Sequence, residues 1–358
     1  MRNAAAGLRR PGVWPALLAA LLFGVGTPAA KLLLDKAVDP WLLAGLLYCG
    51  SGVGLAVFRL LARRVPVRPS RTEWLWIAGA ITAGGVAGPV LLMAGLAAMS
   101  ASGASLLLNA EAVLTAVLAW VVFGENAGRR VVSGMVLIVA GAVILSWPGT
   151  GGVTWGQGTG PLLVVAACLC WAIDNNLTRK VSLTDETWLA MIKGLFAGPV
   201  NLGLGFAAGA AWPSAGQVLG AGLIGLAAYG VSLVLFIIAL REVGTARAGA
   251  YFSTAPFAGA VLALVLGDPF TWQLGAAGGL MAVGVFLHLT EAHDHAHTHA
   301  ETTHTHRHRH DDGHHDHDHP EPVSPGTWHT HQHTHKPVTH SHPHTPDAHH
   351  RHAHPRSG

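Results

Sequence analysis

Glu111 and Asn109 are the residues whose position in the sequence points most directly to chemistry. Both lie in an apolar run of membrane-spanning length, SLLLNAEAVLTAVLAWVVFGE, which ends at Glu125. A carboxylate within hydrocarbon costs several kcal/mol unless it is protonated, paired or turned toward a hydrated cavity. Glu111 is therefore a candidate proton carrier or partner for a cationic solute. The alternative is an ion pair with an intramembrane base that only stabilises the helix bundle.

Lys193 is the candidate base, although its stem is also long enough to reach the membrane interface. Asp174, Asn175 and Asn176 follow one another in a different apolar segment, so at least one of them should face inward. Asp174 is a second candidate carboxylate and could reach Lys193 or Thr178. The two asparagines can hydrogen-bond a polar solute or join helices. The predicted solute and proton pathway comprises Glu111, Asn109, Asp174, Asn175, Asn176, Lys193, Tyr251 and Thr254.

The C-terminal tail is a second chemical signal, because it holds all but one of the 24 histidines. Neutral imidazoles on a flexible chain suit Zn²⁺, Ni²⁺ or Co²⁺. The alternative is a low-complexity expansion without a selected role. No cofactor is expected to be required, and metal is not the expected cargo, since the only other histidine, His288, ends the last apolar segment. The candidate metal ligands are His293, His295, His297, His299, His304, His306, His308, His310, His314, His315, His317 and His319.

Ten apolar segments must position these residues. Residues 1–290 are almost entirely apolar segments, whereas the tail has too few apolar residues to bury a core and is predicted to be disordered. Each segment is long enough to cross a hydrocarbon layer of about 30 Å. They are approximately Val13–Leu34, Trp41–Leu61, Trp74–Ala98, Gly103–Phe123, Val131–Trp147, Pro161–Leu177, Thr187–Ala210, Gln217–Leu240, Arg247–Leu266 and Trp272–Leu289.

Basic residues set the expected orientation. Arginine and lysine gather at the N-terminus and in the even-numbered connections, as in the run from Arg59 to Arg71. Cytoplasmic loops carry such an excess, so both termini and the tail are predicted to be cytoplasmic. The expected location is the cytoplasmic membrane.

The ten segments repeat as two sets of five. FGVGTPAAKLLL from Phe23 aligns with WAIDNNLTRKVS from Trp171, and the stretch that ends at Glu125 aligns with the one that ends at Asp268. An odd number of spans per repeat gives the two halves opposite orientations. Inverted repeats are typical of secondary transporters, which bind substrate near the midplane between the halves.

These motifs, together with FGE at Phe123 to Glu125, resemble the drug/metabolite transporter superfamily and its EamA-type permeases over about residues 12–289. The resemblance implies ten helices around a central cavity, lined by spans one, three and four and their counterparts six, eight and nine. It also implies a small organic solute as cargo. Asp268 stands where the family has a terminal glutamate.

The predicted fold class is an all-α integral membrane protein with an inverted five-plus-five repeat. The predicted divisions are a cytoplasmic N-terminus (1–11), the first repeat (12–147), an external linker (148–160), the second repeat (161–289) and the tail (290–358).

The predicted function is secondary transport of a metabolite, amino acid or drug by alternating access, as proton-coupled efflux through Glu111. The alternatives are a divalent-metal permease and a non-transporting membrane metal sensor. An enzyme is not expected, because the spans and their short connections contain no catalytic dyad or phosphate-binding loop. The expected partners are a small solute, the lipid bilayer and divalent metal at the tail, but not nucleic acid; a homodimer stays open.

Overall fold

The structure is a computed structural model with two units, residues 1–291 and 292–358, each considered by itself. The first unit is α-helical, and the described part of the second consists of short strands. The described residues are 12–64, 67, 69–123, 129–147, 159–178, 185–243, 249, 251–289, 293–299, 302–308, 329–335 and 338–344.

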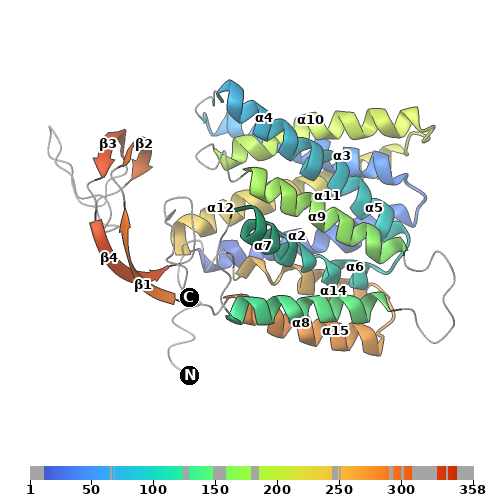
Figure 1. Ribbon diagram of the computed structural model, residues 1–358. Helices are drawn as coiled ribbons and strands as arrows, with labels where there is room; N and C mark the ends of the chain where they lie inside the picture. Colours follow the sequence, from blue (N-terminus) through green and yellow to red (C-terminus); the bar gives the residue numbers. More distant parts are fainter. Residues whose placement is uncertain are drawn as a thin grey trace. The chain divides into compact units, whose positions relative to one another are not determined.

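The helical unit is an integral membrane protein (Figure 1). Among the described residues, eight helices are long and apolar enough to cross a membrane, and two shorter apolar helices complete the ten spans. The elements are α2 (Val13–Leu34), α3 (Pro40–Leu61), α4 (Arg71–Ala80), η1 (Ile81–Ala87), α5 (Gly88–Ala97), α6 (Ala101–Leu107), α7 (Ala110–Phe123), α8 (Arg129–Ser146), α9 (Thr159–Thr178), α10 (Glu186–Ala207), α11 (Ala215–Gly225), η3 (Leu226–Val231), α12 (Ser232–Val243), α14 (Ala255–Val265) and α15 (Trp272–Leu289).

The third and eighth spans each contain a π-helical turn, η1 and η3, at equivalent places in the two repeats. Both spans also begin with a capping box, Ser70 with Glu73 and Ser214 with Gln217. The serine hydroxyl accepts a hydrogen bond from the third backbone amide of its helix, and the Glu or Gln side-chain oxygen accepts one from the backbone amide of the serine. The two repeats therefore share local irregularities as well as their order of spans.

The fourth and ninth spans are each interrupted. Between α6 and α7 the backbone tightens to three-residue hydrogen bonds, with Glu111 N donating to Leu108 O over 3.1 Å. At the equivalent place before α14, Thr254 N donates to Tyr251 O over 3.2 Å. Such turns leave carbonyl groups available to side chains in the middle of a span. Glu111 therefore lies directly after a helix break.

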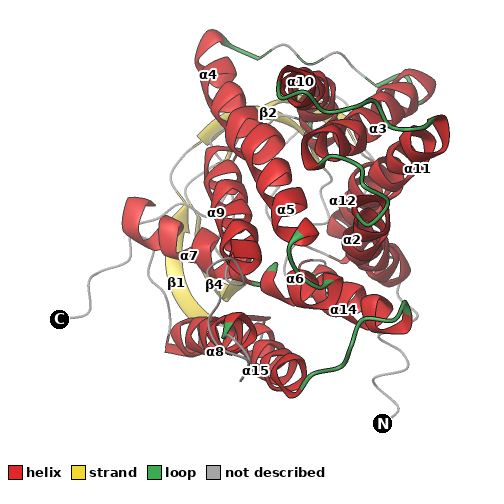
Figure 2. Cartoon of the chain, turned by 90° about the vertical axis from the view of Figure 1, so that its right-hand side faces the viewer, coloured by secondary structure: helices red, strands yellow, loops and turns green. Residues whose placement is uncertain are grey.

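The first span of each repeat packs against helices of the other repeat. The first span, α2, packs against α12 and α14 of the second repeat, and the sixth span, α9, packs against α5 and α7 of the first (Figure 2). Asp268 adds an inter-repeat contact, since its carboxylate accepts a hydrogen bond from Ser102 N, at the start of α6, over 2.8 Å. Neither repeat is thus a separate bundle.

The second and seventh spans, α3 and α10, pack together along a glycine-lined interface. A Cβ atom placed on Gly194 would lie 2.6 Å from Gly52 Cα, and one placed on Gly198 would lie 2.8 Å from Cys49 N. Glycine allows helix backbones to approach this closely, and dispersion then drives association in lipid. At one end of this interface the guanidinium of Arg59 pairs with Asp185 over 2.8 Å.

The tail differs from its sequence prediction in four segments. β1 (His293–His299) pairs antiparallel with β4 (Val338–His344), and β2 (Thr302–His308) pairs with β3 (His329–His335). These four segments form strands, whereas the sequence predicts disorder for the whole tail. The alternation of histidine with threonine and other residues has the period of two that a strand needs, and threonine and valine favour extended backbone.

Candidate functional site

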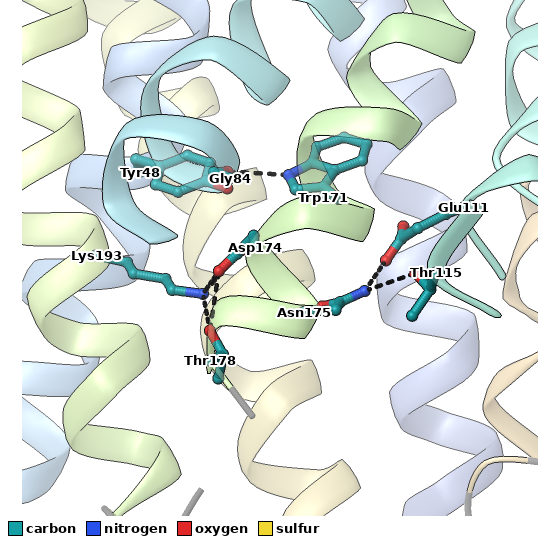
Figure 3. Close-up of polar contacts among 9 residues, drawn as sticks. All are labelled: Tyr48, Gly84, Glu111, Thr115, Trp171, Asp174, Asn175, Thr178 and Lys193. Atoms are coloured by element: carbon teal, nitrogen blue, oxygen red, sulfur yellow. Dashed lines mark hydrogen bonds and ion pairs between the residues drawn. The ribbon is translucent and has the colours of Figure 1, made fainter. Parts of the chain in front are cut away.

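The sixth span, α9, carries the polar cluster of the membrane unit (Figure 3). Trp171, Asp174, Asn175 and Thr178 are spaced at i, i+3, i+4 and i+7, which places them along one side of the helix. Because α9 packs between the third and fourth spans of the other repeat and is followed by α10, these side chains reach three different helices. The cluster is therefore built across both repeats.

Asp174 forms an ion pair with Lys193 of α10. The Nζ atom of Lys193 lies 2.6 Å from Oδ1 and 2.7 Å from Oδ2 of Asp174, and 3.3 Å from Oγ1 of Thr178. Thr178 also donates to Asp174 over 2.9 Å. The side chains are only 9% (Asp174) and 17% (Lys193) exposed, so each charge depends on the other for compensation. Lys193 therefore points inward to Asp174.

Glu111 is partnered differently. Its Oε1 atom accepts a hydrogen bond from Nδ2 of Asn175 over 2.8 Å, and the same amide lies 3.4 Å from Oγ1 of Thr115. Glu111 is half-buried and Asn175 is exposed. Among the described residues, no basic side chain lies within ion-pair distance of Glu111. Its one side-chain partner in the described part of the chain is a neutral amide, which does not compensate a negative charge.

The carbonyl of Gly84, in η1, accepts two side-chain hydrogen bonds. Tyr48 Oη donates to it over 2.8 Å and Trp171 Nε1 over 2.9 Å. The sequence explains why no backbone amide of the helix bonds to this oxygen. Gly88 N bonds to Ala83 O in the π-helical turn, and the next donor in that register would be residue 89, a proline without an N–H group.

Two other predicted pathway residues have structural contacts. Asn176 donates to Ala172 O over 2.8 Å and to Thr115 O over 3.3 Å, so it joins α9 to α7. Asn109 is buried, donates to Leu106 O over 2.8 Å at the helix break, and lies 4.0 Å from the sulfur of Met281. Asn109 thus faces the tenth span, away from the pair of Glu111 and Asn175.

Tyr251 and Thr254 lie at the break of the ninth span, where Thr254 Oγ1 donates to Tyr251 O over 2.6 Å. Among the described residues, no hydrogen bond or ring contact joins these two to the cluster on α9. The structure thus brings together five of the eight predicted pathway residues, namely Glu111, Asp174, Asn175, Asn176 and Lys193.

The cluster also contains residues that the sequence did not single out, chiefly Tyr48, Thr115 and Trp171. Thr115 could have been found, because it follows Glu111 by one helical turn. Trp171 and Tyr48 could not have been found from the sequence, since their partner is a backbone carbonyl in another span. Aromatic rings continue from Tyr48 to Tyr229 (5.8 Å between centroids) and from Tyr229 to Phe23 (5.8 Å).

The predicted metal ligands are placed only in part. His293, His295, His297 and His299 lie in β1, and His304, His306 and His308 lie in β2. His310, His314, His315, His317 and His319 lie outside the described residues. Within the described ranges, no group of three or more His, Cys, Asp or Glu residues is placed to hold a metal ion.

Comparison with known proteins agrees with this architecture. Residues 10–147 and 158–290 each match the EamA-like transporter family. A protein of Methanothermobacter thermautotrophicus described as an uncharacterized transporter is 28% identical over 288 residues, which cover 76% of this chain and 84% of that protein. A crystal structure titled only as that of a protein has a TM-score of 0.58 at 18% identity, over 78% of this chain and 96% of the other, which shows a common fold. With ten spans in two such repeats, the chain belongs to the EamA-like transporter family within the drug/metabolite transporter superfamily.

Proposed function

We propose that this membrane transporter moves a small organic solute across the cytoplasmic membrane by alternating access, and that Glu111 couples the movement to protons. The pairing of Glu111 with the neutral amide of Asn175, while Lys193 is held by Asp174, is the observation that carries the proposal. A half-buried carboxylate without a basic partner is free to bind either a proton or a cationic group of the solute. Competition between the two for one carboxylate couples their movements.

The position of Glu111 supports a role in alternating access. It follows the break between α6 and α7, and that span packs against α9 of the other repeat. A charge at a discontinuous helix between inverted repeats lies where secondary transporters bind their substrates. The excess of basic residues in the even-numbered connections supports cytoplasmic termini.

The test is flux in proteoliposomes that contain the full-length protein. The probes are radiolabelled amino acids, fluorescent organic cations, and Zn²⁺, Ni²⁺ and Co²⁺, each with and without an imposed pH gradient. We expect at least one organic probe to move with the gradient and Glu111→Gln to remove the effect of the gradient. Glu73→Gln is the matched control, because Glu73 is an exposed carboxylate that caps the start of α4.

The same assay decides between this proposal and two alternatives. If only metal ions move, and only when the tail is present, the protein is a divalent-metal permease. If no probe moves but metal binds, it is a membrane metal sensor. A chain that ends at Thr290 separates these outcomes, since organic-solute transport should survive removal of the tail.

Metal binding by the tail is a separate proposal and rests on its histidine pattern. Imidazole must be neutral to bind metal, so binding of Zn²⁺, Ni²⁺ or Co²⁺ should weaken below about pH 6.5. Isothermal titration of the full-length protein against the chain that ends at Thr290 would test it. Equal metal binding by the two chains would contradict it.

A further inference from the structure

The π-helical turn η1 in the third span is in close contact with the sixth and seventh spans of the second repeat. Three of its glycines, or glycines next to it, face second-repeat side chains. A Cβ atom on Gly84 would overlap the Asp174 side chain, one on Gly85 would lie 2.8 Å from Ala197 Cβ, and one on Gly88 would lie 3.0 Å from Trp171 Nε1. The absence of side chains on this turn therefore serves contact between the repeats.

Two backbone carbonyls of η1 are bonded by second-repeat side chains. Trp171 Nε1 donates to Gly84 O over 2.9 Å, and Asn201 Nδ2 donates to Gly85 O over 3.1 Å. Pro89 lacks the N–H group that would otherwise bond Gly85 O in an α-helix. The freed carbonyls thus bind donors from spans six and seven, across the boundary between the repeats.

A third donor to the same turn comes from within the first repeat. Tyr48 Oη, on α3, donates to Gly84 O over 2.8 Å, so a single carbonyl accepts one bond from each repeat. Motion of the third span relative to α9 and α10 would have to break or lengthen the bonds from Trp171 and Asn201. Thr82 Oγ1 instead donates to Ala78 O within the third span, over 2.9 Å, so the same motion would leave that bond intact.

Asn201 has only part of its hydrogen-bonding capacity satisfied within the described residues. It is fully buried, yet its Oδ1 atom has no hydrogen-bond donor among the residues that the structure describes. A buried amide oxygen without a donor costs free energy, and most buried polar atoms are satisfied. An alternative arrangement of the repeats that supplies a donor would offset the loss of the bond to Gly85.

We infer that Trp171 and Asn201 are positioning residues that latch the π-helical turn of the third span to the second repeat, and that these two hydrogen bonds open and close in the transport cycle. The latch adjoins the proposed proton site on one helix, since Trp171 lies one turn before Asn175, the partner of Glu111. The inference goes beyond the proposed function, because it concerns the coupling between the repeats and not the identity of the solute.

Hydrogen–deuterium exchange of the full-length protein in lipid nanodiscs tests the latch. Trp171→Phe removes one inter-repeat donor while it keeps an aromatic ring, and Asn201→Leu removes the other while it keeps the branched shape of the side chain. We expect amide exchange in peptides that cover residues 81–90 to accelerate roughly two- to tenfold, the effect of one neutral hydrogen bond on an opening equilibrium. Unchanged exchange in both variants would overturn the inference, provided that both elute as folded protein in size-exclusion chromatography.

Thr82→Val is the matched control, because it removes a side-chain hydrogen bond of the same turn that lies within the third span and does not reach the second repeat. Flux of an organic probe is then compared at equal amounts of folded protein. We expect Trp171→Phe and Asn201→Leu to change the maximal rate and Thr82→Val to leave it unaltered. If all three variants change the rate alike, the bonds only stabilise the fold and the inference is wrong. Failure of the proton-coupling proposal would instead be seen in Glu111→Gln, so the two can fail independently.

Discussion

Asn175 and Asp174 are adjacent on α9, but they belong to two different carboxylate contacts. The amide of Asn175 donates to Oε1 of Glu111 over 2.8 Å, while the carboxylate of Asp174 binds Lys193 over 2.6 Å. The first is a hydrogen bond from a neutral amide to a carboxylate across the two repeats. The second is an ion pair within the second repeat. The same turn of α9 therefore contains Asp174, whose charge is compensated by Lys193, and contacts Glu111, which has no basic partner among the described residues.

Asn175→Leu should reduce proton-driven flux of the organic probe by about tenfold or more. A hydrogen bond to a charged group contributes about 1.5–3 kcal/mol, and Asn175 donates one to Glu111. If Asn175 acts only through Glu111, the double variant Glu111→Gln with Asn175→Leu should transport no more slowly than Glu111→Gln alone. An additive loss in the double variant would show that Asn175 contacts the solute independently.

Lys193→Met should destabilise the protein by about 3–5 kcal/mol, because it leaves the buried carboxylate of Asp174 without a compensating charge. Replacing both partners, with Asp174→Leu and Lys193→Met, should recover most of that loss, since an apolar pair needs no compensation. Thermal unfolding in detergent, followed by size-exclusion chromatography, provides the measurement. A double variant as unstable as the single one would contradict this account of the pair.

Gly84→Ala should lower the yield of folded protein, because the new methyl group would overlap Asp174 and displace it from Lys193. Gly203→Ala is the matched control. It lies within α10 with nothing inside 4 Å of an added Cβ atom, so it should be neutral or stabilise the helix by up to about 1 kcal/mol. Equal effects of the two substitutions on the unfolding temperature would exclude a steric role for Gly84.

Asp185 should make stability depend on acid pH. Burial alone would raise the pKa of this carboxyl, but hydrogen bonds from Arg59, Thr187 and the backbone amide of Trp188 outweigh burial and hold the pKa below its usual value. A lowered folded-state pKa stabilises the protein fully above the unfolded value, near pH 3.9, and the contribution is lost as the pH falls through the folded value.

Asp185→Asn should therefore lower the unfolding temperature at pH 6 and narrow its difference from the wild type as the pH approaches 3. Asparagine retains an oxygen that can cap α10, so the capping bond to Trp188 is preserved and only the charge is removed. A constant difference between the two proteins across this pH range would rule out the ion pair with Arg59 as its source.

The number of spans, the repeat and the position of Glu111 within the membrane could be predicted from the sequence. Each follows from a local property, since about twenty apolar residues are sufficient to define a span and a carboxylate among them is costly wherever the helix packs. Lys193 and Thr178 were both possible partners of Asp174 by sequence, because Thr178 lies one turn away on the same span and Lys193 lies on the next span.

The tertiary structure determines which carboxylate forms the ion pair with Lys193. Glu111 and Asp174 were both possible partners of Lys193 by sequence, and only the rotation and depth of α7, α9 and α10 place Lys193 beside Asp174. The same holds for the breaks near Asn109 and Thr254 and for the π-helical turn at Gly84, where a freed carbonyl is stabilised by donors from distant spans. Hydropathy reports the transfer of one segment into lipid, whereas these contacts depend on the distances between segments. The apolar sequence therefore determines that the chain crosses the membrane, and helix packing determines which polar groups meet inside it.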